Sequence, residues 1–234
     1  MKGIKVVNKG ERGEIYITGT IVDDFTGDML KGFDINEGYA FPAKIRDALK
    51  ELEGKPIDVY IDSNGGLVSA GMSIAAMLKR HKAGTVAHID TWAASIASVI
   101  ALACDSVEMP AGTYIMVHRP LVEVCGNVDD LNEAIAFLNK IGDGMLDIYE
   151  NKAAEGVTRE KIWDAMVAET WLNPAEAAAM FSNVHETEAK FAVAAEAVSY
   201  ENAPDEVKNM VFGKALKAIE ESRGIGDEKE RGIS

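Results

Sequence analysis

The chain has 234 residues, of which 47% are hydrophobic and 26% charged, and its formal net charge is −14 at pH 7. This composition is typical of a globular protein with one sizeable core, and so negative a charge disfavours binding to nucleic-acid phosphates. The longest apolar run, residues 93–104, is about half as long as a membrane span. We therefore expect neither a nucleic-acid nor a membrane partner.

The cysteine content favours a reducing environment. Cys104 ends an apolar run and Cys125 follows in a predicted loop, so the sequence predicts neither a disulfide framework nor a metal site. The first residues also lack the apolar core of a signal peptide. We expect a cytoplasmic protein without a metal ion or cofactor.

The hydrophobic pattern alternates strands and helices with short connections between them. The first half reads as strand 14–22, an Asp- and Gly-rich loop 23–38, helix 39–52, strand 57–62, helix 67–82, strand 84–90 and helix 93–104. The second half reads as strands 106–109 and 113–117, a long helix 128–154, and helices 158–168 and 174–181. This order predicts an α/β fold with a largely parallel sheet.

The composition changes after residue 183, where alanine and glutamate become frequent. We expect one domain over residues 1–188 and a C-terminal extension over 189–234. Within the extension, the pattern predicts an amphipathic helix at 204–222 and a charged, disordered tail at 224–234.

Two junctions between a strand and a helix are candidate sites. Ser95 is predicted about one turn into a helix, where free N–H groups and the helix dipole favour an oxyanion, although small residues there also suit close packing. Gly65-Gly66 ends another strand. This pair suits a tight turn, or a backbone N–H aimed at an oxyanion, and its spacing fits neither common phosphate-loop pattern.

Four histidines are available as a general base. His81 lies in a charged helix end, His88 in the middle of a buried strand, where packing or hydrogen bonding is expected, and His185 in an acidic loop. His118 ends an apolar strand, at the rim of the predicted sheet where α/β proteins gather their sites. His118 is therefore the best candidate.

Several short motifs occur in a characteristic order along the chain. They are Gly65-Gly66, Ala70-Gly71-Met72-Ser73-Ile74, Ala93-Ala94-Ser95, Met116-Val117-His118-Arg119-Pro120 and Trp171-Leu172-Asn173-Pro174-Ala175-Glu176-Ala177. Together they resemble the motifs of the ClpP family of serine peptidases, and the interval of 95 − 65 = 30 positions between Gly65 and Ser95 agrees with the family's spacing. The resemblance covers about residues 14–188.

The resemblance implies a catalytic triad. It assigns Ser95 as the nucleophile and His118 as the general base, and it places Glu169 where the family has an aspartate. Asp164 is a rival for the role of the acid, and Glu169 could instead be a salt-bridge residue. A triad needs an acceptor behind the base to fix its tautomer and stabilise the imidazolium.

The resemblance also implies the surroundings of the triad. It assigns the oxyanion hole to the backbone N–H groups of Gly66 and Ile96. Peptide substrates would bind in an extended form against Gly65, Leu67, Leu121 and Val122.

The implied fold is a ClpP/crotonase-like spiral of β-α-β units with a protruding long handle helix over residues 128–154. Implied partners are further copies of the chain in a ring, a protein or peptide substrate, and an AAA+ unfoldase. The alternative interpretation of residues 128–154 is an ordinary amphipathic helix without a role in assembly.

The sequence departs from the family pattern near the site. Asn64 replaces a proline before the glycine pair, Trp92 lies close to Ser95 where it could reshape the S1 pocket, and Glu169 replaces aspartate. The axial-loop segment is also not recognisable, which weakens the case for an unfoldase. These departures favour the ClpP-related proteases of phages, which process capsid proteins during head maturation. An inactive assembly subunit and a crotonase-fold acyl-CoA enzyme are the alternatives.

Overall fold

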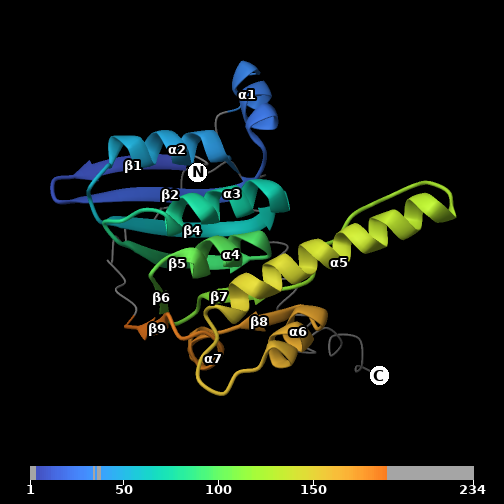
Figure 1. The fold of residues 1–234 in the computed structure, drawn as a ribbon. Helices are drawn as coiled ribbons and strands as arrows, with labels where there is room; N and C mark the ends of the chain where they lie inside the picture. Colours follow the sequence, from blue (N-terminus) through green and yellow to red (C-terminus); the bar gives the residue numbers. More distant parts are fainter. Residues whose placement is uncertain (1–3, 34, 36–37, 189–234) are drawn as a thin grey trace, which may run out of the picture. The chain divides into compact units, whose positions relative to one another are not determined.

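The computed structural model describes residues 4–33, 35 and 38–188, and its strands form one nine-stranded sheet (Figure 1). The main strand order is β1-β2-β4-β5-β6-β9, while β3 pairs with β2, and β7 pairs with both β5 and β8. The strands are β1 Ile4–Lys9, β2 Arg12–Ile21, β3 Tyr39–Ala40, β4 Ile57–Gly66, β5 Thr85–Ala94, β6 Ser106–Pro110, β7 Tyr114–Val117, β8 Thr170–Leu172 and β9 Val184–Thr187.

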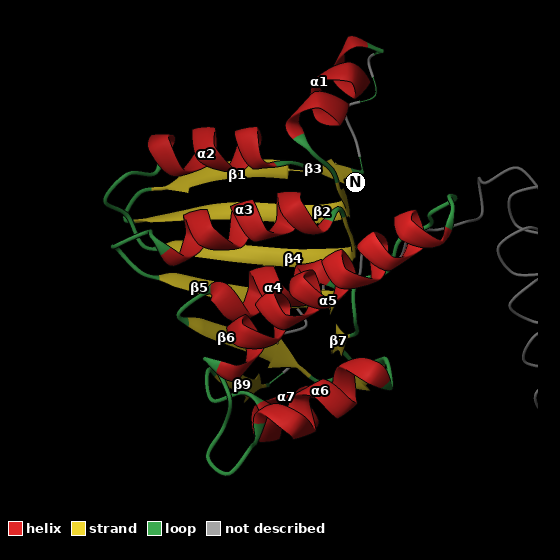
Figure 2. Ribbon diagram, turned by 45° about the vertical axis from the view of Figure 1, so that its right-hand side comes forward, coloured by secondary structure: helices red, strands yellow, loops and turns green. Residues whose placement is uncertain are grey.

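Helices cover one face of this sheet. Figures 1 and 2 show α2, α3 and α4 side by side on that face, with α6 and α7 beside β8 and β9. The helices are α1 Asp24–Gly32, α2 Pro42–Glu51, α3 Val68–Lys79, α4 Ile96–Ala103, α5 Val128–Glu150, α6 Arg159–Val167 and α7 Pro174–Met180.

The alternating strand pattern explains which face is covered. In β4, Ile57, Val59 and Ile61 are fully buried, whereas Asp58 and Tyr60 between them are partly exposed. Because successive side chains of a strand point to opposite faces, the isoleucines and valine meet the helices. The strand pairs β2–β4, β4–β5 and β5–β6 are parallel, so the predicted α/β class with a largely parallel sheet is confirmed.

Most predicted elements are present, and the errors concern one helix, one helix start and several short strands. Residues 24–32, predicted as loop, form α1, because Asp23 caps the helix by accepting a hydrogen bond from the N–H of Thr26 at 2.7 Å. Residues 39–40 form β3 instead of the start of a helix, which begins at Pro42. The short edge strands β1, β8 and β9 were not predicted, since each forms through its pairing with a neighbour.

The long helix α5 projects away from the sheet (Figure 1). It begins at a capping box in which Asn127 and Asp130 bond each other's backbone N–H groups. Its second half is anchored, since Met145, Leu146 and Tyr149 are buried, whereas Val128, Ile135 and Phe137 in its first half are exposed. Among the described residues, no helix is both long and apolar enough to cross a membrane.

The amphipathic helix predicted at 204–222 and the tail predicted at 224–234 lie outside the described residues. The division into a domain 1–188 and an extension 189–234 therefore stays a prediction.

Candidate active site

Ser95 lies at the turn between β5 and α4. Its backbone has φ 57° and ψ −130°, and the helix starts only at Ile96, so the prediction of Ser95 one turn inside the helix was wrong. The strand β5 continues to Ala94 because Ala93 and Ala94 pair with Ile115 and Met116 of β7. A side chain on so sharp a turn is presented at the carboxyl edge of the sheet.

Both polar groups of the Ser95 backbone are hydrogen-bonded. Its N–H donates to the carbonyl oxygen of Met116 at 3.0 Å, and its carbonyl oxygen accepts from the N–H of Ser98 at 3.0 Å and from the Ser98 hydroxyl at 2.6 Å. A positive φ costs a non-glycine residue about 1–3 kcal/mol. These bonds hold the strained turn in place.

His118 directly follows β7, and its side chain lies against Ser95. The distance from its Nε2 to the Ser95 Oγ is 2.6 Å, which is a short hydrogen bond. Burial lowers the pKa of His118, and the negative charge of Glu169 partly opposes this effect. A His118 pKa below the usual range keeps the imidazole neutral at pH 7, as a general base must be.

Glu169 directly precedes β8, the strand that pairs with β7. The antiparallel pairing of Val117 with Thr170 brings the neighbouring positions, His118 and Glu169, opposite each other. Glu169 has φ 50°, and its N–H donates to the carbonyl of Met166 at 3.4 Å. Its side chain is exposed and, within the described part of the chain, makes no hydrogen bond, so it influences His118 through charge and not through direct contact.

Asp164, the rival acid, lies on α6 with an exposed side chain. The carboxylate whose charge acts on the pKa of His118 is that of Glu169.

Gly65 and Gly66 are the last residues of β4, where Gly65 lies against the nucleophile and Gly66 against Ile21 of β2. A Cβ atom on Gly65 would be 2.7 Å from the Ser95 Cβ and 2.8 Å from the Ala94 carbonyl oxygen, and one on Gly66 would be 2.1 Å from the Ile21 carbonyl oxygen. Their φ values of 93° and 148° are also unfavourable for other residues. Glycine is therefore required at position 65 for β4 to approach Ser95 and at position 66 for β4 to approach β2.

The N–H of Ile96 occupies the first position of α4, where the helix offers no backbone acceptor. This N–H directly follows Ser95 in the chain, and Gly66 directly follows Gly65, the residue of β4 that approaches Ser95.

The comparisons with known proteins agree with this arrangement. A family model described as "Clp protease" matches residues 44–181, which is more than half of the chain and includes Ser95, His118 and Glu169. The chain belongs to the Clp protease family. The nine-stranded α/β architecture is consistent with the ClpP/crotonase-like fold that the sequence predicted.

Curated relatives are distant but match more than half of this chain. An ATP-dependent Clp protease proteolytic subunit of Bdellovibrio bacteriovorus is 29% identical over 182 residues, covering 74% of this chain and 83% of the relative. One from Bacteroides fragilis is 25% identical over 165 residues, covering 70% and 73%. Proteolytic subunit 1 of Chlamydia abortus is 30% identical over 142 residues, covering 56% and 73%.

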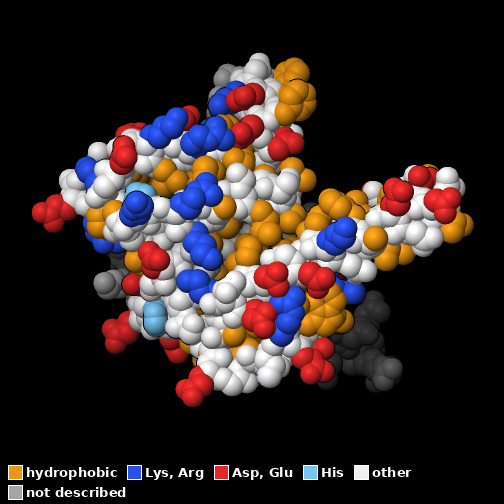
Figure 3. Space-filling model, in the orientation of Figure 1, with side chains coloured by type: hydrophobic (Ala, Val, Ile, Leu, Met, Phe, Trp, Pro, Cys, Tyr) orange, Lys and Arg blue, Asp and Glu red, His pale blue; other side chains and the backbone are white. Residues whose placement is uncertain are grey.

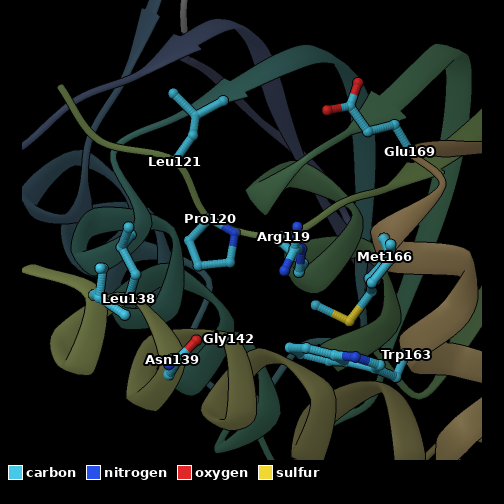
Figure 4. Close-up of a pocket in the computed structure, with 11 residues that line it drawn as sticks. Arg119, Pro120, Leu121, Leu138, Asn139, Gly142, Trp163, Met166 and Glu169 are labelled. Atoms are coloured by element: carbon cyan, nitrogen blue, oxygen red, sulfur yellow. The ribbon is translucent and has the colours of Figure 1, made fainter.

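A pocket of 320 Å³ adjoins the site of this Clp protease family member (Figure 4). Figure 4 shows Leu138 and Asn139 from α5 on one side and Trp163 and Met166 from α6 on the other. Glu169 and Leu121, which were predicted as acid and substrate contact, also line it. The pocket therefore lies between the segment that follows His118 and the middle of α5.

The other predicted substrate contacts are at the surface. Leu67 is 46% exposed, Leu121 74% and Val122 53%, which leaves them accessible to a bound chain. Arg119, which sequence reasoning did not single out, lines the pocket with its guanidinium 5.8 Å from the ring centroid of Trp163.

Two hydroxyl-bearing residues near Ser95 were also missed. Ser98 donates to the Ser95 carbonyl, and the hydroxyl of Tyr149 lies 2.7 Å from the Ser98 Oγ. The sequence could have indicated Ser98, because it is the one polar residue in the apolar stretch IASVIALA. It could not have indicated Tyr149, because the contact of Tyr149 with Ser98 is made between two helices, α5 and α4.

The remaining histidines lie away from Ser95. His88, expected to be packed or hydrogen-bonded, stacks on Tyr60 and contacts Asp58 and Glu108 at 3.1 and 3.2 Å. His81 bonds the carbonyl of Lys55 at 2.7 Å, and His185 lies in β9 instead of a loop.

Trp92 packs edge-on against Trp171, with ring centroids 6.2 Å apart, and lines a different pocket together with Asp62 and Asn64.

Proposed function

We propose that this chain is a serine endopeptidase in which Ser95 is the nucleophile and His118 the general base. The observation that carries the proposal is the 2.6 Å hydrogen bond between Ser95 Oγ and His118 Nε2, made by a histidine whose pKa burial lowers. A serine hydroxyl is a weak nucleophile unless a neutral base in hydrogen-bond contact removes its proton.

The proposed reaction has two halves. The Ser95 Oγ attacks the scissile carbonyl while His118 Nε2 takes the hydroxyl proton, and the N–H groups of Gly66 and Ile96 stabilise the oxyanion. The C–N bond then breaks as His118 gives the proton to the leaving amine. A water molecule, deprotonated by His118, hydrolyses the acyl-enzyme and restores Ser95.

In this proposal Glu169 is the acid of the triad. Two observations support it over Asp164: the β7–β8 register places Glu169 opposite His118, and the charge of Glu169 raises the pKa of that histidine. Glutamate has one more methylene than the family's aspartate. Rotation of its exposed side chain toward Nδ1 of His118 would complete the triad.

Labelling with a fluorophosphonate probe tests the proposal. The wild-type protein should be labelled on Ser95 and cleave peptide amides of aminomethylcoumarin, and Ser95→Ala should lose labelling and about 10³-fold or more of the cleavage rate. Ser182→Ala, which removes an exposed serine hydroxyl before β9, is the matched control and should behave as wild type.

Folded wild-type protein that is neither labelled nor active would contradict the proposal. Intact assembly without labelling would then favour a non-catalytic assembly subunit, and thermal stabilisation by an acyl-CoA would favour a thioester enzyme.

The proposed peptidase works as a homo-oligomer, a ring in the ClpP manner. Figure 3 shows hydrophobic side chains along the projecting α5. Val128 is 72% exposed, Ile135 57% and Phe137 63%, and so many exposed apolar side chains on one projecting helix are typical of an interface. Light scattering should give a mass of several subunits, and a monomer at micromolar concentration would exclude the ring.

The proposed substrates are phage capsid proteins, cleaved during head maturation. The support is the set of sequence departures at Asn64, Trp92 and Glu169, together with the C-terminal stretch beyond the family match. Cleavage of an assembled capsid precursor without any ATPase would favour this role. Cleavage only in the presence of an AAA+ unfoldase would instead favour the role named for the ATP-dependent relatives.

A cytoplasmic location also stays a prediction.

A further inference from the structure

The peptide unit between Ser95 and Ile96 is held by side chains outside the triad. Its carbonyl oxygen accepts two hydrogen bonds from Ser98, one from the N–H at 3.0 Å and one from the Oγ at 2.6 Å. Ser98 lies on α4 and is 0% exposed, so no water competes for these bonds.

The direction of the next hydrogen bond follows from proton counting. A carbonyl oxygen only accepts, so the single proton of the Ser98 hydroxyl is used on Ser95. The Tyr149 hydroxyl, 2.7 Å from Ser98 Oγ, must therefore be the donor of that contact. Tyr149 is itself 0% exposed, and burial raises the pKa of its hydroxyl, which keeps the donor proton in place.

The geometry of the peptide group links these hydrogen bonds to the orientation of the Ile96 N–H. No peptide bond in the described residues is cis, and in a planar trans peptide the C=O and N–H point in opposite directions. Fixing the Ser95 carbonyl toward the inside of α4 thus turns the Ile96 N–H outward, away from the helix. That N–H is the oxyanion donor of the proposed mechanism.

We propose that Ser98 and Tyr149 are positioning residues that orient the Ile96 N–H toward the oxyanion. The inference rests on the proposed peptidase function. Ser98 acts directly on the peptide, and Tyr149 acts only through Ser98. Because Tyr149 belongs to the anchored half of α5, the chain of hydroxyls also ties that helix to the nucleophile turn.

A double-mutant cycle with Ser98→Ala and Tyr149→Phe tests this inference. Both changes remove a hydroxyl with little loss of volume. A misaimed oxyanion donor lowers kcat and leaves KM nearly unchanged, and we expect Ser98→Ala to lower kcat by about tenfold or more. Tyr149→Phe alone should give a several-fold loss, and it should give no further loss in the Ser98→Ala background.

Two measurements separate positioning from a merely structural role. Titration with the fluorophosphonate probe gives the number of active sites, so that kcat is expressed per folded site. The inhibition constant of a peptide boronic acid, whose adduct places an oxygen in the oxyanion hole, should weaken by the same factor as kcat/KM. Thr85→Val removes another buried hydroxyl at the opposite end of β5, and it should leave kcat per site unchanged.

Unchanged kcat per site in both single variants would overturn the inference, as would additive losses in the double variant. A wild-type protein that shows neither labelling nor cleavage would instead overturn the proposed function. The two failures are thus distinguishable.

Discussion

The turns that carry the nucleophile and the proposed acid differ in how firmly they are held. Ser95 and Glu169 are the two non-glycine residues with positive φ in the described chain, at 57° and 50°. Ser95 uses its N–H, its carbonyl and its hydroxyl in hydrogen bonds of 2.6–3.0 Å. Glu169 is held by one backbone bond of 3.4 Å, and its side chain is exposed.

This difference indicates how the proposed site divides its work. The nucleophile and the base are already in hydrogen-bond contact, so the entropy cost of bringing them together is paid on folding and not during the reaction. The acid acts from a looser turn and across solvent-accessible space, where a charge interaction is weaker than in a buried site. Changes around Ser95 should therefore cost far more activity than changes at Glu169.

Among changes that keep the side chains of Ser95 and His118, the largest effect is expected for Gly65→Ala. The added Cβ would lie 2.7 Å from the Ser95 Cβ, so either β4 or the nucleophile must move. We expect kcat/KM to fall by about 100-fold or more, because a displacement of about 1 Å at a reacting group has this cost. Peptide cleavage and the rate of fluorophosphonate labelling measure the loss.

Gly156→Ala is the matched control for that change. Gly156 has φ 78° and no atom within 4 Å of an added Cβ, so the variant carries the same kind of backbone strain without the clash. It should lose about 1–2 kcal/mol of unfolding free energy and keep its activity. Equal losses of activity in both variants would show that strain, and not the contact with Ser95, is responsible.

An intermediate effect is expected for Glu169→Gln. Removing a triad carboxylate that is buried and bonded to the histidine costs about 10⁴-fold in kcat, and the exposed position of Glu169 should reduce this to about 10- to 100-fold. Steady-state cleavage by Glu169→Gln and Asp164→Asn, measured side by side, checks the assignment. A greater loss in Asp164→Asn would transfer the role of acid to Asp164.

The smallest effect is a shift in the pH profile. Burial lowers the pKa of His118 from its ordinary 6.5, so kcat/KM should rise with pH through an inflection below 6.5. Because the charge of Glu169 raises this pKa, Glu169→Gln should move the inflection to still lower pH.

The lowered pKa of His118 also makes the unfolding free energy depend on pH. The unfolded chain binds the His118 proton more tightly than the folded protein does. The folded protein is therefore not penalised by His118 above pH 6.5, and it loses stability as the pH falls below 6.5. An inflection in kcat/KM above pH 6.5 would show that a different group is titrating.

The sequence was sufficient for the α/β class and for most strands and helices, because alternating and helical hydrophobic patterns record burial directly. It was also sufficient to select Ser95 and His118 as a candidate pair and Gly65-Gly66 as a junction near them. It failed at α1, where a single capping aspartate, Asp23, starts a helix in a polar stretch. It failed equally at β8 and β9, which are too short to show a pattern and depend on their neighbours.

Only the tertiary structure decided how these residues meet. The 2.6 Å contact of Ser95 with His118 depends on the pairing of β5 with β7, which joins residues 23 positions apart. The place of Glu169 beside His118 depends on the pairing of β7 with β8, and the link from Tyr149 to Ser98 depends on the packing of α5 against α4. Sequence patterns record which face of an element is buried, whereas distances between elements are set by side-chain packing, which no local pattern contains.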